Sequence, residues 1–242
     1  MTYSQEIFGT RGSDRIEARD AIVVGNDGND VITSLGNVLA YGENGNDTVV
    51  AGVTGGKTEF VGAAGIDTLQ VEAGTFELQA WGYPEGIVRI DVAGTGVPAI
   101  EAWGIEIVKF LDGSAMFNLQ TAEGLTAAAL YEAAFDRRPD SGGMEYWMTS
   151  AKPAQQMARD FIGSAEGQTA FGGLSNQDFV ETLYQNVLDR EGEAGGVQHW
   201  TSQLEAGALD RGDVLASFAL SDENVALIGQ MNPSGWLQNF AA

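Results

Sequence analysis

The first half of the chain carries its apolar residues in short bursts that glycine-bearing turns separate. Runs such as 21–24 (Ala-Ile-Val-Val), 38–41 (Val-Leu-Ala-Tyr) and 68–71 (Thr-Leu-Gln-Val) are rich in β-branched side chains. They are too short for helices, and their composition favours strands of roughly three to five residues. Longer strands with alternating apolar positions are expected near residues 76–81, 87–92 and 105–111.

From about Leu125 onward the apolar spacing becomes helical. Residues 179–188 follow one face of an amphipathic helix, and Ser175 stands where an N-cap is expected. This change of period predicts a boundary between two domains near residues 120–125.

The helical half contains two copies of one pattern. Leu-Tyr, Asp-Arg, a glycine and a tryptophan recur in the same order 53 residues apart, and Ser-x-Glu recurs 57 residues apart. The paired positions are Leu130-Tyr131 and Leu183-Tyr184, Asp136-Arg137 and Asp189-Arg190, Gly143 and Gly196, Trp147 and Trp200, and Ser164-x-Glu166 and Ser221-x-Glu223. We therefore expect two similar helical units, over about 125–170 and 176–228.

Glycine and aspartate recur together in the first half. The segments 9–14, 25–30, 42–47 and 62–67 all fit G-x-x-G-x-D, and a large apolar residue follows two positions after each aspartate. Glycine lets the backbone turn tightly and leaves its carbonyl oxygens exposed, and the aspartate adds a carboxylate. Calcium accepts about six to eight oxygen ligands at irregular geometry, so the pattern favours calcium-binding turns. The alternative is a β-solenoid of either hand in which Asn and Asp only close the turns.

These turns resemble the RTX nonapeptide G-G-x-G-x-D-x-U-x, which forms a calcium-binding, right-handed parallel β-roll. The resemblance implies that calcium lies between turns stacked one coil apart. The second glycines of the four turns are 16, 17 and 20 residues apart, close to one coil of about 18 residues. The turns between them lack the aspartate, so we expect one calcium-binding edge and one plain edge.

Four stacked turns would make up to three calcium sites, and the pair Asp30 and Asp47 matches the pattern best. Arg11 brings a positive charge into the first turn, and residues 63–66 leave the fourth poor in polar side chains. The segment 104–113, which ends in Asp-Gly, resembles segments that close RTX regions, and we expect it to cap the open end of the roll. The implied metal-binding residues are Asp14, Gly25, Asp27, Gly28, Asp30, Gly42, Asn44, Gly45, Asp47, Gly62, Gly65 and Asp67.

The repeated helical pattern resembles a module of unknown function that often follows RTX repeats in secreted and surface-layer proteins of bacteria. The resemblance covers roughly residues 125–225, and the second copy departs from it where Gly192-Glu193 replaces Pro139-Asp140. The arginine of each Asp-Arg pair is expected to bridge a helix end to Glu166 or Glu223. Alternatively, the loops 136–145 and 189–198 bind an ion or a sugar.

Two tryptophans of this module, Trp147 and Trp200, are candidate ligand-binding residues because an indole can stack on a sugar ring. Tryptophans that recur at matched helical positions are also typical of a core. The sequence is compatible with both interpretations.

The charge of the chain limits its partners. Its 242 residues include 34 acidic and 12 basic ones, which gives a net charge of -22. Such a chain is not expected to bind nucleic acid or anionic membranes, and it attracts cations instead. There is no cysteine, which excludes disulfides and thiolate metal sites. Neither an ordinary signal peptide at the N-terminus nor an apolar run long enough to span a bilayer is recognised.

We do not expect an enzyme. The single histidine, His199, occupies the position of Tyr146 in the other repeat, so the position requires a ring rather than an imidazole. No G-x-S-x-G, H-E-x-x-H or phosphate-binding loop is present. A glycosidase built on two of the many carboxylates stays an open alternative.

Together these patterns predict an α+β chain of two domains. Residues 1–122 would form the calcium-binding β-roll, residues 123–230 the all-α domain, and residues 231–242 an uncharged tail. The resemblance to RTX proteins implies type I secretion directed by a C-terminal signal, and this tail is compatible with such a signal. The predicted function is a secreted structural or adhesive protein of a bacterial surface layer or extracellular matrix, which folds when calcium binds after export. Self-assembly or a cell-surface polysaccharide is the expected partner. The alternative is a carbohydrate- or protein-binding accessory or effector module.

Overall fold

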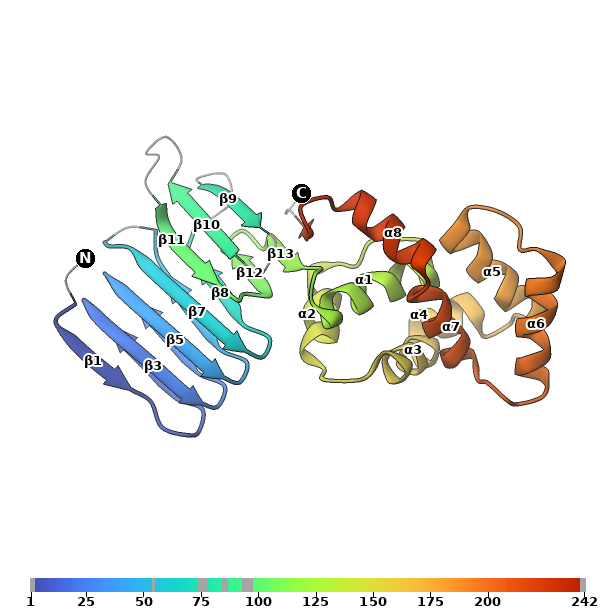
Figure 1. The fold of residues 1–242 in the computed structure, drawn as a ribbon, viewed down its shortest axis with the longest axis horizontal. Coiled ribbons are helices and arrows are strands. Elements are labelled where there is room, and N and C mark those ends of the chain that lie inside the picture. Colours follow the sequence, from blue (N-terminus) through green and yellow to red (C-terminus); the bar gives the residue numbers. More distant parts are fainter. Residues whose placement is uncertain (1–2, 54, 74–77, 84–86, 93–97, 240–242) are drawn as a thin grey trace. The chain divides into compact units, whose positions relative to one another are not determined.

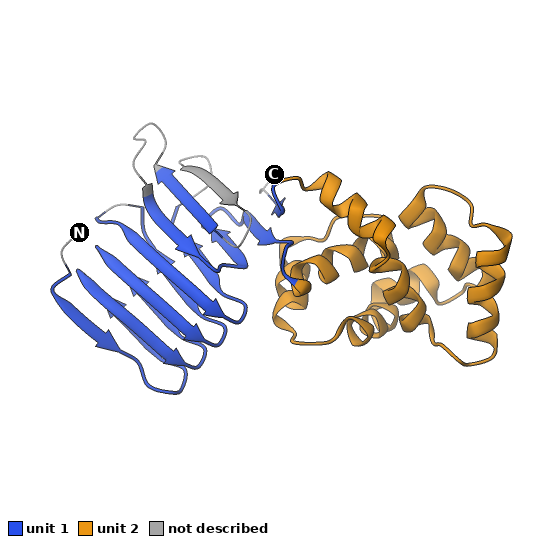
Figure 2. Ribbon diagram, in the orientation of Figure 1, with its two compact units in different colours: residues 1–121, 234–242 blue, residues 122–233 orange. Residues whose placement is uncertain are grey.

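The computed structural model describes residues 3–53, 55–73, 78–83, 87–92 and 98–239, and the chain divides into two compact units (Figure 2). The first unit comprises residues 1–121 together with 234–242, and the second comprises residues 122–233. The tail is therefore divided between the units. Its strand β14 (Trp236–Asn239) pairs with a strand of the first unit.

The first unit is a β-solenoid of about 4 turns over residues 5–118 (Figure 1). The first eight strands alternate between two sheets, because each of these coils gives one strand to each sheet. The next three strands extend the first sheet, and the last three extend the second. The first sheet has the order β1 (Gln5–Phe8), β3 (Ala21–Asp27), β5 (Val38–Asn44), β7 (Thr58–Ala64), β11 (Pro98–Trp103), β10 (Ile87–Val92) and β9 (Leu78–Tyr83). The second sheet has the order β14, β13 (Ala115–Asn118), β12 (Ile107–Phe110), β8 (Thr68–Val71), β6 (Thr48–Ala51), β4 (Val31–Ser34) and β2 (Arg15–Ala18).

The apolar bursts become strands because every second side chain enters the space between the two sheets. In β3, β5 and β7 buried residues alternate with partly exposed ones, and the parallel strands align them into rows. The core rows include Val23, Ala40 and Phe60 from the first sheet and Ile32, Val49 and Leu69 from the second, all 0% exposed. The predicted solenoid of short parallel strands is confirmed.

The two edges of the solenoid differ in the regularity of their turns. From β3 onward, turns from the first sheet to the second keep one length, over 28–30, 45–47 and 65–67. The returning turns lengthen along the chain, over 19–20, 35–37 and 52–57. The unequal distances between the glycine motifs along the chain therefore come from the returning turns. The aspartate turns at the other edge stay aligned from coil to coil.

The C-terminal end of the solenoid contains the expected capping strand and two further strands. Strand β12 does continue the second sheet in parallel with β8, and Gly113 makes the expected Asp-Gly turn with a φ of 85°. Strands β13 and β14 extend the sheet beyond it as antiparallel strands, so more than one strand covers this end. Trp236 of β14 is 1% exposed and joins the core, which explains why an apolar tail is held there.

The second unit contains eight helices: α1 (Ala122–Phe135), α2 (Ser141–Thr149), α3 (Ala154–Gly163), α4 (Ala165–Phe171), α5 (Asn176–Leu188), α6 (Ala194–Glu205), α7 (Arg211–Ala219) and α8 (Asp222–Met231). They correspond pairwise, since α1 to α4 match α5 to α8 in order and α6 is longer than α2. Ser175 caps α5 as expected, with its side chain accepting a hydrogen bond from the N–H of Asp178.

Rings and buried amides hold the helices together. Phe135 stacks on Phe161 and Phe171, with centroid distances of 5.7 and 6.2 Å. Asn224 of α8 is 0% exposed and donates to the carbonyl oxygen of Ala129 in α1 at 3.1 Å. Among the described residues, none of the helices combines the length and the apolar character that a bilayer crossing requires.

Candidate metal centre

The turns of the second, third and fourth motifs share one strained backbone conformation. In each of them the second residue and the second glycine have a positive φ: Asn26, Glu43 and Ala63 at 75°, 76° and 82°, and Gly28, Gly45 and Gly65 at 120°, 127° and 137°. A Cβ on Gly45 would collide with the carbonyl oxygen of Gly28 one coil earlier. This position therefore needs glycine both for its φ and for the close stacking of neighbouring turns.

The motif aspartates Asp14, Asp30, Asp47 and Asp67 form a hydrogen-bonded stack, which we call the aspartate ladder. The backbone N–H of each aspartate donates to Oδ1 of the aspartate one coil later, and all three of these distances are 2.8 Å. At the C-terminal end the N–H of Asp67 donates to Oε2 of Glu106, also at 2.8 Å. Glu106 therefore takes the place of a fifth aspartate. Strand register aligns Trp103 with Val61 and Ile107 with Thr68, which leaves fewer residues in this turn, and the longer side chain of Glu106 makes up the difference.

The other oxygen of three ladder carboxylates has no partner. Asp30, Asp47 and Asp67 are at most 1% exposed, and Oδ2 of each makes no hydrogen bond to any of the described residues. Leaving a buried polar group unpaired costs about 1–3 kcal/mol, and more when the group is charged. Each of these oxygens therefore needs either a proton or a cation.

The unpaired oxygens lie beside glycine carbonyl groups of the next coil. A Cβ on Gly42 would collide with Oδ2 of Asp47 and would lie 2.9 Å from the carbonyl oxygen of Gly62. The same arrangement recurs one coil earlier, where Oδ2 of Asp30 and the carbonyl oxygen of Gly42 flank Gly25. Glycine thus leaves room for a carboxylate oxygen and a carbonyl oxygen from neighbouring coils to approach one space, and both are hard donors that suit calcium.

The first rung of the ladder differs from the others. Oδ2 of Asp14 accepts hydrogen bonds from the N–H and the hydroxyl of Thr10, at 2.5 and 2.9 Å. Its own turn thus satisfies this carboxylate. The geometry separates Asp14 from Asp30, Asp47 and Asp67, although the sequence pattern treats the four alike.

Burial changes the acidity of the inner rungs. Loss of water raises the pKa of Asp47 to about 6, and the neighbouring Asp30 carboxylate adds to this while the hydrogen bond from its N–H opposes it. Burial likewise raises the pKa of Asp67 to about 7. Without a cation these carboxylates hold protons more tightly than they would in water.

Two of the expected ligands lie away from the buried oxygens. Asp27 and Asn44 are exposed, and Nδ2 of Asn44 donates to Oδ1 of Asp27 at 3.0 Å. A second stack of hydrogen bonds runs beside the aspartate ladder and was not expected from the sequence. Oδ1 of Asn29 accepts from the N–H of Asn46 at 2.9 Å, and Oδ1 of Asn46 accepts from the N–H of Ile66 at 3.0 Å. The available signal was the repetition of Asn immediately before Asp in the second and third motifs.

The donor set restricts which cations fit the ladder. In the part of the chain that the structure describes, no group of three or more His, Cys, Asp or Glu residues is arranged to hold a metal ion. A cation here would take one or two carboxylate oxygens and complete its shell with backbone carbonyls and water. Calcium accepts such a shell, whereas transition metals favour imidazole and thiolate ligands.

The candidate residues of the helical unit serve packing. Arg137 donates to both carboxylate oxygens of Glu166 at 2.9 and 3.0 Å and lies 4.9 Å from the ring centre of Tyr131, which confirms the predicted bridge. The corresponding bridge in the second repeat is wrong, because Arg190 pairs with Glu193 at 2.7 Å. Glu193 stands three residues away at the start of α6 and is the nearer carboxylate in sequence.

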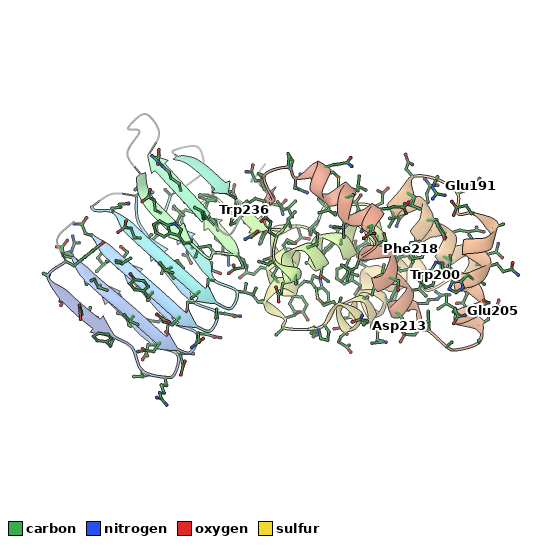
Figure 3. All side chains as sticks on the ribbon, viewed as in Figure 1. Glu191, Trp200, Glu205, Asp213, Phe218 and Trp236 are labelled. Carbon is green, nitrogen blue, oxygen red and sulfur yellow. The ribbon has the colours of Figure 1, made fainter. Side chains whose placement is uncertain are left out.

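The two candidate tryptophans differ in burial. Trp147 is 9% exposed and packs 4.7 Å from the ring of Phe161, as the core interpretation expects. Trp200 is only partly buried, and its ring centre lies 5.7 Å from that of Phe218. Both residues are labelled in Figure 3. It lines a small cavity of about 160 Å³ with Tyr184 and Glu223.

Comparison with known proteins identifies one region of the chain. No curated protein matches the sequence. Residues 158–228 match a family that is described as a domain of unknown function, DUF4214. This segment runs from within α3 to within α8 and so includes the whole second repeat. The helical unit therefore contains a DUF4214 domain at residues 158–228.

Proposed function

We propose that this chain is a secreted, calcium-dependent structural or adhesive protein of a bacterial surface layer or extracellular matrix. In this proposal the solenoid is an RTX-like β-roll, and calcium ions bind along the aspartate ladder. The helical unit, with its DUF4214 domain, is then a companion module rather than a catalytic one.

One observation carries the calcium proposal. Three stacked aspartates are buried, and each has one oxygen without a partner beside a glycine carbonyl oxygen of the next coil. A turn that served only to reverse the chain would not need to bury a carboxylate oxygen unpaired. A divalent cation between coils neutralises these oxygens and links neighbouring turns at the same time.

Calcium would couple binding to folding. The net charge of -22 makes the compact state repel itself when cations are scarce. Because the ladder is assembled only in the folded solenoid, the free energy of calcium binding adds directly to folding stability. Extracellular modules of this kind bind calcium at roughly 10⁻⁴–10⁻³ M, which would keep the chain unfolded in the cytosol and fold it outside.

Export and assembly rest on the resemblance to RTX proteins. Such proteins typically leave the cell unfolded through type I secretion, which suits a solenoid that closes only in calcium. The surface-layer or matrix role rests on the resemblance of the helical unit to a module that often follows RTX repeats in secreted and surface-layer proteins of bacteria.

The proposal is tested by following the full-length protein by circular dichroism and calorimetric titration. The expected result is that EGTA removes strand signal, that millimolar calcium restores it, and that magnesium at the same concentration does not. Unchanged strand content and an unchanged melting temperature after thorough chelation would refute calcium-coupled folding. Asp30→Asn should weaken the calcium response, whereas the matched change Glu72→Gln at an exposed site of the solenoid should not.

A further inference from the structure

A row of apolar side chains crosses the outer face of the first sheet. Strand register places Phe8, Val24, Tyr41, Val61 and Trp103 opposite one another on β1, β3, β5, β7 and β11, which lie side by side in Figure 1. These five residues, which we call the aromatic row, alternate along their strands with residues that face the core. The row therefore faces solvent.

The aromatic row is unusual for the solvent face of a sheet. Phe8 is 64% exposed and Trp103 is 37% exposed, while Tyr41 is partly exposed. The outer face of a half-buried strand is ordinarily polar, and exposed apolar side chains gathered in one place mark an interaction surface. The core does not need this row, because the opposite side of each strand supplies the core residues.

The rings in the row are regularly spaced. They stand on β1, β5 and β11, every second strand, and the two valines stand between them on β3 and β7. Neighbouring strands are about 4.8 Å apart, so the spacing from ring to ring is about 9.6 Å. This spacing is close to the disaccharide repeat of an extended β-1,4-linked glycan. The valines are smaller than the rings and leave the surface level between them.

Polar groups flank both sides of the aromatic row. On one side, Lys57 pairs with Glu59 at 2.9 Å and with Glu101, and both glutamates face outward two residues before members of the row. On the other side, Asn26 and Glu43 line a hollow of about 660 Å³ next to Val24. A sugar ring has apolar C–H faces and hydroxyl groups at its rim, which match a ring platform with polar borders.

Charge decides which glycan fits. The flanking carboxylates and the net charge of -22 would repel a polyuronate or a sulfated chain. We propose that the aromatic row binds an uncharged, extended β-1,4-linked polysaccharide, whose chain runs across the strands with every second sugar stacked on a ring. This polysaccharide would be the ligand of the adhesive role in the proposed function. The inference rests on that proposal only because it requires a folded solenoid.

The test measures depletion of the full-length protein from solution by insoluble glycans. Wild-type protein in millimolar calcium, shown to be folded by circular dichroism, is incubated with microcrystalline cellulose, with chitin and with granular starch. Binding to cellulose or chitin but not to starch, whose α-1,4-linked chains coil, is the expected result. The two positive arms distinguish glucan from amino-sugar polymer.

Variants connect binding to the row. Tyr41→Ala should lower the affinity at least tenfold and Trp103→Ala should do the same, while Tyr146→Ala, which removes a 57% exposed ring from the helical unit, should bind like wild type. Each variant is first shown to keep the wild-type calcium response and strand signal. Failure of the folded wild type to bind cellulose and chitin would overturn the proposal, as would wild-type affinity in both row variants.

The same variants separate glycan binding from self-association. A second copy of this chain could also cover the row, and light scattering across a range of concentrations detects this. Dimers that Tyr41→Ala abolishes, without any glycan binding by the wild type, would assign the row to self-association instead. If the protein folds without responding to calcium, its glycan binding can still be measured. The calcium proposal and the glycan proposal can therefore fail separately.

Discussion

Replacing Asp47 with asparagine should have opposite effects on stability with and without calcium. Asparagine keeps an oxygen that can accept the hydrogen bond from the N–H of Asp30, and its amide can donate toward the carbonyl oxygen of Gly62. The variant removes the charge of a buried carboxylate that has one unpaired oxygen. It also removes a hard oxygen ligand from the middle of the ladder.

The magnitude without calcium follows from the acidity of Asp47. Its pKa rises from 3.8 to about 6 on folding, so the ionised group destabilises the folded state by about 3 kcal/mol at pH 8. Asp47→Asn should therefore raise the free energy of unfolding by up to about 3 kcal/mol in EGTA at pH 8. The gain should fall to about half at pH 5 and nearly vanish below pH 3.8, where wild-type Asp47 is protonated in both states.

Urea unfolding of the full-length protein measures both effects, in millimolar calcium and in EGTA with enough sucrose to keep the calcium-free solenoid folded at the start of the titration. In calcium the order should reverse, because wild type gains binding free energy that the variant largely loses. Glu72→Gln removes one exposed charge from the same unit and should shift neither midpoint by much. A variant that is less stable than wild type in EGTA at pH 8, or that gains as much from calcium as wild type does, would contradict this reasoning.

Three further outcomes are expected. Calcium-free wild type, kept folded by the same sucrose, should lose stability in urea titrations as pH rises from about 4 to about 7. The reason is that the folded state binds protons more tightly at Asp47 and Asp67, whose pKa values are about 6 and 7. Stability that rises over this range would contradict the prediction. Gly45→Ala should abolish cooperative thermal unfolding of the solenoid, because its Cβ would collide with the Gly28 carbonyl oxygen, whereas Gly113→Ala, with open space around it, should cost only about 1–2 kcal/mol. Arg137→Ala should lower helical-unit stability by about 1 kcal/mol in urea, since the arginine stacks on a ring and pairs with the half-exposed Glu166, and Arg190→Ala should cost less.

The fold class could be predicted from local signals in the chain. Short β-branched runs between glycine turns, and then helical spacing, indicate a solenoid followed by helices, and the structure has both. The last strands could not be predicted, because β14 is distant in sequence from its partner β13 and only tertiary pairing brings them together. The sequence shows that Trp236 is apolar, but it does not show which strand Trp236 lies beside.

The sequence predicted which aspartates stack in neighbouring coils, but not which of their carboxylate oxygens have hydrogen-bond partners. The motif names Asp14, Asp30, Asp47 and Asp67 as equals, yet Thr10 satisfies the first while the other three keep an unpaired buried oxygen. The fifth rung, Glu106, carries no motif, because its turn is shorter and a longer side chain replaces the missing residues. A hydrogen bond within the first turn decides the first difference, and a hydrogen bond between coils decides the second. The motif shows neither, because it fixes only the spacing of glycine and aspartate along the chain.

The sequence by itself determined the local conformations of this protein: where the backbone must take a positive φ, which segments are extended, and where helices begin. These depend on side chains within a few residues of one another. The tertiary structure alone decided which groups lose water and which align. Members of the aromatic row are 16, 17, 20 and 42 residues apart in the chain, and no period links them. They share a row because parallel strands stack in register while the returning turns absorb the difference in length.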